Sequence, residues 1–222
     1  MRAIVLAAGE GYQVGGFNKI LLRRPDTGET IMDQYMRLFH GLDITVVVGY
    51  RAVNIMNLYP DLNYVYNADW QFTQDSRSLS LALSDEPCYV VQTDLFIMDD
   101  VLGLLREDDG MLAAHKENRS RTDVNVRVEN GRIANIYPGE LRRPDDVQPL
   151  DVYKVCDRHL LRIWKRNCRE NPHIYSVLNL PIEEHRPIHA AVTAESSVIQ
   201  IKTPLDYANF LRRCGSEGGT RP

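Results

Sequence analysis

A glycine-rich passage directly follows the first apolar run of the chain. Residues 3–8 are apolar and of strand length, and they lead into Gly9 and Gly11. Because glycine has no Cβ, such a loop can bring its backbone N–H groups close to the phosphates of a nucleotide. Lys19 follows soon after and would place a positive charge on the same anion. By itself the pattern also fits an ordinary corner between a strand and a loop, so its meaning depends on the rest of the chain.

Asp94 is the second candidate for chemistry. It directly follows a buried apolar run at residues 88–92. Ligands of open α/β sheets bind at the carboxyl ends of such strands, so a carboxylate at this point would face a ligand. The alternative is that Asp94 caps a turn before a helix near Met98, although Asp99 and Asp100 are better placed for that role.

Apolar runs alternate with helical patterns in the first half of the chain. We expect strands at residues 2–8, 44–50, 64–66 and 88–92, and helices from Thr30 to Gly41, at 51–58 and at 77–84. Continuous apolar strands separated by helices are typical of a parallel sheet covered on both faces, with right-handed crossovers. The fold class expected is therefore α/β, with three layers and a mostly parallel, Rossmann-like sheet.

The second half of the chain is richer in β patterns, which predicts a small β extension of the sheet. We expect strands at residues 111–115, 123–129, 132–137, 150–155 and 197–201, with Asn130-Gly131 as a type I′ hairpin turn. Helices are expected at 157–169, 174–180 and 204–213. The chain is interpreted as a single domain at 1–213, with a nucleotide-binding half at about 1–110, an acceptor-binding half at about 111–213, and a disordered tail at 214–222.

Composition limits the possible partners. With 25% charged and 44% hydrophobic residues, the sequence is typical of a soluble globular protein. Its net charge of −4 argues against a nucleic acid or an anionic membrane as the main partner. No apolar run is long enough to span a membrane, and a cytoplasmic protein is expected. The four cysteines form no C-x-x-C pair, so we expect reduced thiols rather than a zinc site.

Six stretches in a fixed order resemble a known superfamily. Leu6-Ala7-Ala8-Gly9-x-Gly11 with Asn18-Lys19-x-Leu21-Leu22 resembles the signature of nucleotidyltransferases with the GT-A-like Rossmann fold. The further matching stretches are residues 67–70 with 77–83, residues 92–94, and residues 201–207. Together they span residues 3 to 207, and the small-molecule cytidylyltransferases are the most similar in motif.

The resemblance implies transfer of a nucleoside monophosphate from a nucleoside triphosphate to a small phosphate or phosphonate acceptor, with release of pyrophosphate. It implies that Asp94 holds Mg²⁺, for which carboxylate coordination with retained waters is suitable. Lys202 stands where several subfamilies carry a second metal ligand, and a lysine cannot ligate Mg²⁺. The polyol-phosphate type of cytidylyltransferase instead places a lysine on the α-phosphate there. Lys19 and Lys202 are therefore the predicted catalytic cations, with one Mg²⁺ ion.

The resemblance also implies a nucleotide-binding set, in which CTP is the first choice and UTP the second, because a small pocket lined by main chain disfavours a purine. Its members are Leu6, Ala7, Ala8, Gly9, Glu10, Gly11, Gln13, Asn67, Ser78 and Thr93. Ser78 also fits the role of a surface or capping residue. One departure is that Tyr12-Gln13 stands where many relatives have an arginine, so the usual phosphate clamp is missing.

The acceptor is expected to bind in the second half of the chain. Lys116, Arg119 and Arg121 cluster after the strand at 111–115, although such a run is usually a solvated loop. Asp123 and Asp151 are candidates to meet an amine or hydroxyl of the acceptor. Trp70, Tyr153 and Tyr175 are interpreted either as a cation–π wall for a quaternary ammonium or as core.

The acceptor itself stays open between phosphocholine, aminoethyl- or hydroxyethyl-phosphonates, and polyol or sugar phosphates. The acidic and histidine-containing motif of the methylerythritol enzymes is absent, so methylerythritol phosphate is disfavoured. Two other functions stay open on the same fold: a non-catalytic nucleotide- or metabolite-binding protein, and a glycosyltransferase that uses a nucleotide sugar. The latter would need an Asp-x-Asp motif, whereas Gln92-Thr93-Asp94 has one carboxylate. A homodimer is compatible with the sequence, which does not fix the oligomeric state.

Overall fold

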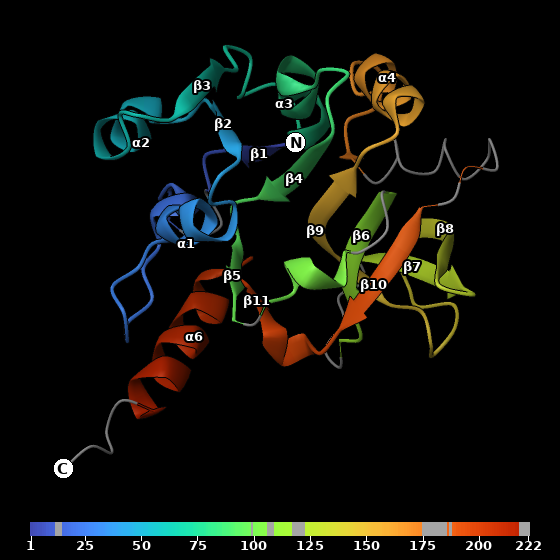
Figure 1. Ribbon diagram of the computed structural model, residues 1–222. Helices are drawn as coiled ribbons and strands as arrows, with labels where there is room; N and C mark the ends of the chain where they lie inside the picture. The colour runs from blue at the N-terminus through green and yellow to red at the C-terminus, as the bar shows by residue number, and fades with distance from the viewer. Residues whose placement is uncertain are drawn as a thin grey trace.

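The computed structural model describes residues 1–11, 15–98, 100–105, 109–116, 123–174, 186 and 188–217. Its centre is a sheet whose strand order is 3-2-1-4-9-6-10-8-7 (Figure 1). In that order the strands are β3 (Asn63–Tyr66), β2 (Asp43–Val48), β1 (Arg2–Ala7), β4 (Cys88–Gln92), β9 (Gln148–Val155), β6 (Asp109–Ala114), β10 (His189–Thr193), β8 (Arg132–Pro138) and β7 (Val124–Glu129).

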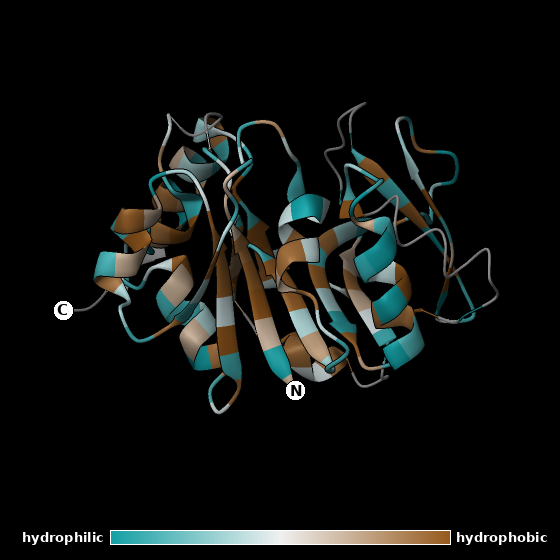
Figure 2. Ribbon diagram, turned by 90° about the horizontal axis from the view of Figure 1, so that it is seen from above, coloured by the Kyte–Doolittle hydropathy of each residue, from teal (hydrophilic) through white to brown (hydrophobic). Residues whose placement is uncertain are grey.

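Helices cover both faces of this sheet, so the predicted three-layer α/β architecture is confirmed. The helices are α1 (Ile31–Leu38), α2 (Ala52–Leu58), α3 (Asp75–Ala82), α4 (Arg158–Asn167) and α6 (Pro204–Glu217). Side chains of α1, α2 and α6 pack on one face with Ala3 and Val5, and those of α3 and α4 pack on the other with Ile4 and Leu6. The central strands are predominantly hydrophobic, as expected for strands buried on both sides (Figure 2).

The direction of the strands divides the sheet. The strands β3, β2, β1 and β4 are parallel, whereas β9 runs antiparallel to both β4 and β6. The chain moves outward from β1 through β2 to β3 and then returns to pair β4 on the other side of β1. The strand order therefore reverses between β1 and β4, and the carboxyl ends of these two strands form the crevice where open α/β sheets bind ligands.

Most of the predicted strands and helices are present, and most of the differences lie after residue 94. The Asn130-Gly131 hairpin is confirmed, since both residues have positive φ angles of 51° and 74°. Two strands were not predicted from the sequence, β10 and the short strand β5 (Leu95–Ile97). The latter pairs with β11 (Val198–Gln200) in a separate two-stranded sheet. The expected end of the last helix at 213 was wrong, because α6 continues to Glu217. The helix expected at 174–180 falls, after Ile174, outside the described residues.

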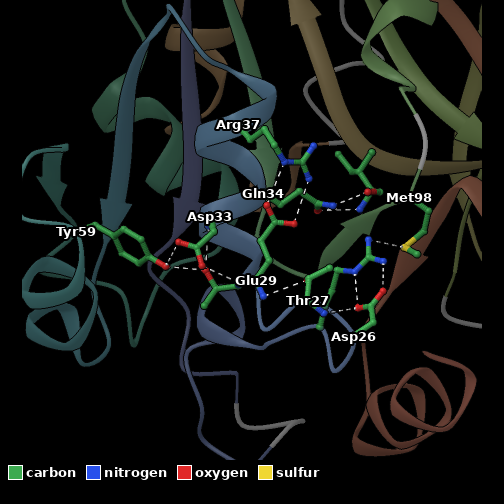
Figure 3. A network of polar contacts seen from close by, with 11 residues as sticks. Asp26, Thr27, Glu29, Asp33, Gln34, Arg37, Tyr59 and Met98 are labelled. Carbon is green, nitrogen blue, oxygen red and sulfur yellow. Dashed lines mark hydrogen bonds and ion pairs between the residues drawn. The ribbon is translucent and has the colours of Figure 1, made fainter. Parts of the chain in front are cut away.

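Helix α1 fixes the segment that carries Asp94. The amide of Gln34 bonds to both backbone groups of Ile97 in β5, and the hydroxyl of Tyr35 donates to the carbonyl of Gln92 at 2.6 Å. A polar network at the start of the helix holds α1 itself in place (Figure 3). Because Gln34 and Tyr35 are fully buried, these bonds are shielded from water. The turn between β4 and β5 is therefore held from both of its ends.

Thr30 is the N-cap predicted for α1. Its hydroxyl accepts from the backbone N–H of Asp33, and the Asp33 carboxylate accepts from the backbone N–H of Thr30, which is a complete capping box. We expect Thr30→Ala to lower the free energy of unfolding by about 1–2 kcal/mol, because the cap and the contact with Tyr59 are both lost. Urea unfolding followed by circular dichroism measures the change. Thr30→Ser, which keeps the hydroxyl, should recover most of it.

No helix among the described residues is long and apolar enough to cross a membrane.

Candidate nucleotide-binding and catalytic site

A cavity of about 570 Å³ lies at the carboxyl ends of β1 and β4. The turn after β1 forms one wall, residues 70–78 form another, and the turn after β4 closes it. All but two of the predicted nucleotide-binding residues line this cavity: Leu6, Ala7, Ala8, Gly9, Glu10, Gly11, Ser78 and Thr93 do so, together with Lys19 and Asp94. The two exceptions are Asn67, which is buried and does not line the cavity, and Gln13, which falls outside the described residues.

The turn after β1 requires glycine at a specific point. Gly11 has a φ angle of 60°, in the left-handed region that glycine adopts without a steric penalty. Lys19 begins a short 3₁₀ turn, Lys19–Leu21. Asn18, the residue before it, holds this turn against the segment that follows β2 by donating from its side-chain amide to the carbonyl of Tyr50 at 2.9 Å. Asn18 is buried, and the sequence analysis assigned it no separate role. The backbone around Lys19 is thus anchored while its side chain lines the cavity.

Asn67 is a positioning residue for the wall opposite the glycine-rich turn. Its side-chain amide donates to Thr73 at 3.1 Å and to the hydroxyl of Ser78 at 3.0 Å, and its carbonyl oxygen accepts from the backbone of Asp69. Asn67 is almost completely buried. These bonds hold the loop at 67–74 against α3 and fix the hydroxyl of Ser78, a residue that lines the cavity.

Trp70 lines the same cavity. It packs edge-on against Tyr50, with 5.2 Å between the ring centroids. This packing needs glycine at position 49, where a Cβ atom would lie only 2.7 Å from both the Ala8 carbonyl and the Trp70 side chain. The aromatic ring is therefore built into the wall next to the glycine-rich turn.

Asp94 is buried, and its two carboxylate oxygens differ in their hydrogen bonding. Its Oδ1 atom is buried without a hydrogen-bond partner, whereas Oδ2 accepts a long bond of 3.4 Å from Gln200. Burial raises the pKa of Asp94, and the positive charges of Lys19 and Lys202 oppose that rise. A buried carboxylate oxygen without a donor is costly unless a cation or a ligand completes it. Asp94 therefore fits a hard divalent cation that takes one carboxylate oxygen and fills its remaining positions with phosphate oxygens and water.

Gln200 connects the two halves of the site, and the sequence analysis missed it. Its amide nitrogen donates to Asp94 and to Asp151, each at 3.4 Å, and its oxygen accepts from Lys116 at 2.7 Å. The available signal was spacing, since residues 200 and 202 point to the same side of an extended segment. Gln92, Gln71, Gln74 and Asp75 also line the nucleotide cavity and were not predicted.

Lys202 lies on the acceptor side of Asp94. Its ammonium group is 3.3 Å from Asp123, and it lines two cavities beside the nucleotide cavity, of about 710 and 100 Å³. Lys116 lines the larger of these, and burial lowers its pKa, with the charge of Lys202 acting in the same direction. The positive charges of Lys19, Lys202 and Lys116 each act to lower the pKa of Asp94. Lysines from both ends of the sequence thus act electrostatically on the Asp94 carboxylate. Of these three lysines, only Lys19 lines the same cavity as Asp94.

The other residues predicted to bind the acceptor do not all line a cavity. Asp123 and Asp151 line the cavity of about 100 Å³. Tyr153 is buried edge-on against Trp164, 5.9 Å between centroids, and its hydroxyl donates to Asp151 at 3.0 Å. The aromatic wall of Trp70, Tyr153 and Tyr175 is not formed by the described residues, because Trp70 packs at the nucleotide cavity and Tyr153 in the core. Arg119, Arg121 and Tyr175 lie outside the described residues.

Asp151 gives a stability test that depends on pH. Burial, followed by the charge of Asp94, raises the pKa of Asp151 to about 7. Since this folded-state pKa lies above the value in the unfolded chain, the group lowers stability as pH rises from about 4 to about 7. We expect Asp151→Asn to raise the free energy of unfolding by about 1 kcal/mol at pH 8 and to change it little at pH 5, where the wild-type carboxyl is protonated.

Thermal unfolding at the two pH values, with the exposed Asp61→Asn as control, measures this difference. Asparagine also tolerates the left-handed backbone of residue 151, whose φ angle is 54°. Equal destabilisation of Asp151→Asn at pH 5 and pH 8 would contradict the electrostatic explanation.

Comparison with solved structures identifies the fold. The CTP:phosphocholine cytidylyltransferase from Streptococcus pneumoniae superposes with a TM-score of 0.75 at 16% identity, over 96% of this chain and 98% of that one. The chain has the nucleotidyltransferase fold. An inositol-1-phosphate CTP transferase from T. maritima matches with a TM-score of 0.74 at 17% identity, over 100% and 98% of the two chains. A putative glucose-1-phosphate thymidylyltransferase from Bacillus anthracis matches equally well, at 14% identity over 96% and 95%.

No protein-family model matches the sequence, and no curated protein sequence matches it significantly. The predicted Rossmann-like nucleotidyltransferase fold is nevertheless confirmed along nearly the whole chain, by structures with which it shares few identical residues.

Proposed function

We propose that this protein is a Mg²⁺-dependent nucleotidyltransferase that transfers CMP from CTP to a phosphate or phosphonate oxygen of a small acceptor. In this reaction the acceptor oxygen forms a bond to the α-phosphorus, and the bond from that phosphorus to the bridging oxygen of pyrophosphate breaks. The observation that carries the proposal is the unpartnered Oδ1 atom of Asp94, buried at the switch point of the sheet in a cavity shared with Lys19 and the glycine-rich turn.

Charge is the main requirement of this reaction, because two anions must approach each other and a third must leave. Mg²⁺ held by Asp94 would neutralise part of the charge on the triphosphate. Lys19 lies on the nucleotide side of Asp94 and Lys202 on the acceptor side. The two ammonium groups are therefore placed to bind the phosphates of the nucleotide and the anion of the acceptor. No side chain needs to form a covalent intermediate.

The choice of CTP rests on the base-binding wall. The main chain of Ala7 and Ala8, the hydroxyl of Ser78 and the ring of Trp70 all line the cavity. Backbone and hydroxyl groups can pair with the polar edge of a pyrimidine, and an indole ring can stack on its face. The fold likeness to two transferases named for CTP supports the same choice.

The test is pyrophosphate release by purified protein with Mg²⁺, each of CTP, UTP, dTTP, ATP and GTP, and a panel of phosphate and phosphonate acceptors. We expect CTP to be the best donor. Calorimetric titration with CTP in the absence of acceptor separates binding from transfer. Tight CTP binding without pyrophosphate release across the panel would favour a non-catalytic binding protein, and preferred turnover of a purine nucleotide would contradict the assigned base specificity.

A further inference from the structure

A cavity of about 100 Å³ beside the catalytic residues is lined mainly by hydrogen-bond acceptors. Asp75, Asp123 and Asp151 contribute three carboxylates, Gln148 contributes an amide, and Lys202 stands at the same cavity. Asp75 also lines the cavity that holds Lys19 and Asp94, so the two cavities are neighbours. A group bound in the small cavity would therefore belong to a molecule that reaches the reacting phosphates.

The side-chain oxygen of Gln148 lacks a hydrogen-bond donor. Its amide nitrogen donates to Asp123 at 2.8 Å, but its Oε1 atom is buried without any hydrogen-bond partner. The residue is 2% exposed, so bulk water does not satisfy this oxygen. Lys202 is directed to Asp123 rather than to Gln148. A residue lining this cavity therefore carries an amide oxygen that no hydrogen bond satisfies within the described part of the chain.

Asp151 is turned toward this cavity at a conformational cost. It has a φ angle of 54° in the middle of β9, next to a point where the register between β9 and β6 shifts. Irregularities of this kind re-aim a side chain and persist where the surrounding structure holds them in place. The only hydrogen bonds to its carboxylate from the described residues come from Tyr153 at 3.0 Å and, at a long 3.4 Å, from Gln200. Lys202 lines the same cavity, but its ammonium group is directed to Asp123, and no ion pair to Asp151 is formed by the described residues.

We propose that the acceptor carries a primary ammonium group, which binds in this cavity between Asp151 and Gln148 while its phosphate or phosphonate lies at Lys202. This inference rests on the proposed function and narrows its acceptor class to aminoalkyl phosphates and phosphonates. An ammonium group has three N–H donors and one positive charge, which complements an unpaired amide oxygen and a carboxylate. Because Lys202 lines the same cavity, the carbon spacer between the acceptor's two charges is short.

A quaternary ammonium fits this cavity less well. It has no N–H donor for the Gln148 oxygen, and proteins usually hold it against aromatic faces. Among the described residues that line the cavity none is aromatic; the non-polar ones are Val124, Pro149 and Ile174. The structure therefore favours a primary amine over choline-like groups.

Calorimetry with two nearly isosteric probes tests the ammonium site. The wild-type protein, with Mg²⁺ and a non-hydrolysable CTP analogue, is titrated with 2-aminoethylphosphonate and with propylphosphonate, in which a methyl group replaces the ammonium. We expect the amine to bind at least about tenfold more tightly, and phosphocholine to bind more weakly than phosphoethanolamine. Asp151→Asn should reduce the tenfold preference to within about threefold, whereas Asp61→Asn on the surface should preserve it.

The same probes are then used as acceptors with CTP, with pyrophosphate as the readout. Preference for the amine without pyrophosphate release would keep the ammonium site and overturn the proposed transfer. Pyrophosphate release that is equally fast with propylphosphonate would keep the transfer and overturn the ammonium site. Equal affinities for the two phosphonates, or no binding of either, would also overturn it, and this comparison needs no variant to fold.

Discussion

Asp94→Asn lowers the rate of pyrophosphate release from CTP by at least about a hundredfold, on the expectation that removing one group that stabilises transition-state charge has an effect of this size. The variant keeps the shape of the side chain and its bond from Gln200, so the fold should be retained. What it loses is the negative charge that would hold Mg²⁺. Because burial raises the pKa of the wild-type carboxyl, neutralising it should not destabilise the protein.

Steady-state rates at several Mg²⁺ concentrations measure this effect, with Asp61→Asn as the matched control at an exposed position. We expect the control to retain wild-type activity and thermal stability. A variant of Asp94 that turns over at more than a third of the wild-type rate would show that this carboxylate does not hold the metal.

Lys19→Met and Lys202→Met are each expected to lower turnover by about a hundredfold in the same assay, since the proposed function assigns each ammonium group to a phosphate of the reaction. The expected binding defects differ. Lys19 lines the nucleotide cavity, so its loss should weaken CTP binding, whereas Lys202 lines the acceptor cavities, so its loss should raise the KM for the acceptor.

Lys165→Met, on the exposed side of α4, is the matched control for both variants. Methionine keeps the length and apolar stem of lysine and removes only the charge. Normal turnover by either Lys19→Met or Lys202→Met, with the control also normal, would remove that lysine from the catalytic site.

The residues around the cavity of about 100 Å³ show why the sequence alone could not decide which acceptor binds. Asp123 and Asp151 were identified as candidates for an amine or hydroxyl, but nothing in the sequence indicated that Gln148 would join them. Gln148 begins β9, and its buried, unpaired oxygen arises from how β9 packs beside the segment at 123–124. An amide near a strand end is common in any sequence, so its role depends on what surrounds it.

Local chemistry in the sequence was sufficient for the parallel strands of the first half and for the start of its first helix. Continuous apolar runs predicted β1, β2 and β4, because strands buried on both faces need no alternation. Thr30 predicted the start of α1, since its hydroxyl satisfies backbone N–H groups that a helix leaves free. Gly9, Gly11, Lys19 and Asp94 fall at the ends of these strands, so the order of elements alone placed them at one edge of the sheet.

Only the tertiary structure decided how the second half completes the site. The strand β11 was expected from the sequence, but its partner β5, a run of three residues, was not, and β5 is held by pairing with β11 and by the bonds from Gln34. This pairing brings Gln200 to Asp94 across more than a hundred residues of sequence. The sequence by itself therefore determined the fold and the nucleotide-binding edge, which depend on local periodicity and turn chemistry. The long-range pairing of two short strands determined that Gln200 reaches Asp94 and that Lys202 lines the cavities beside it.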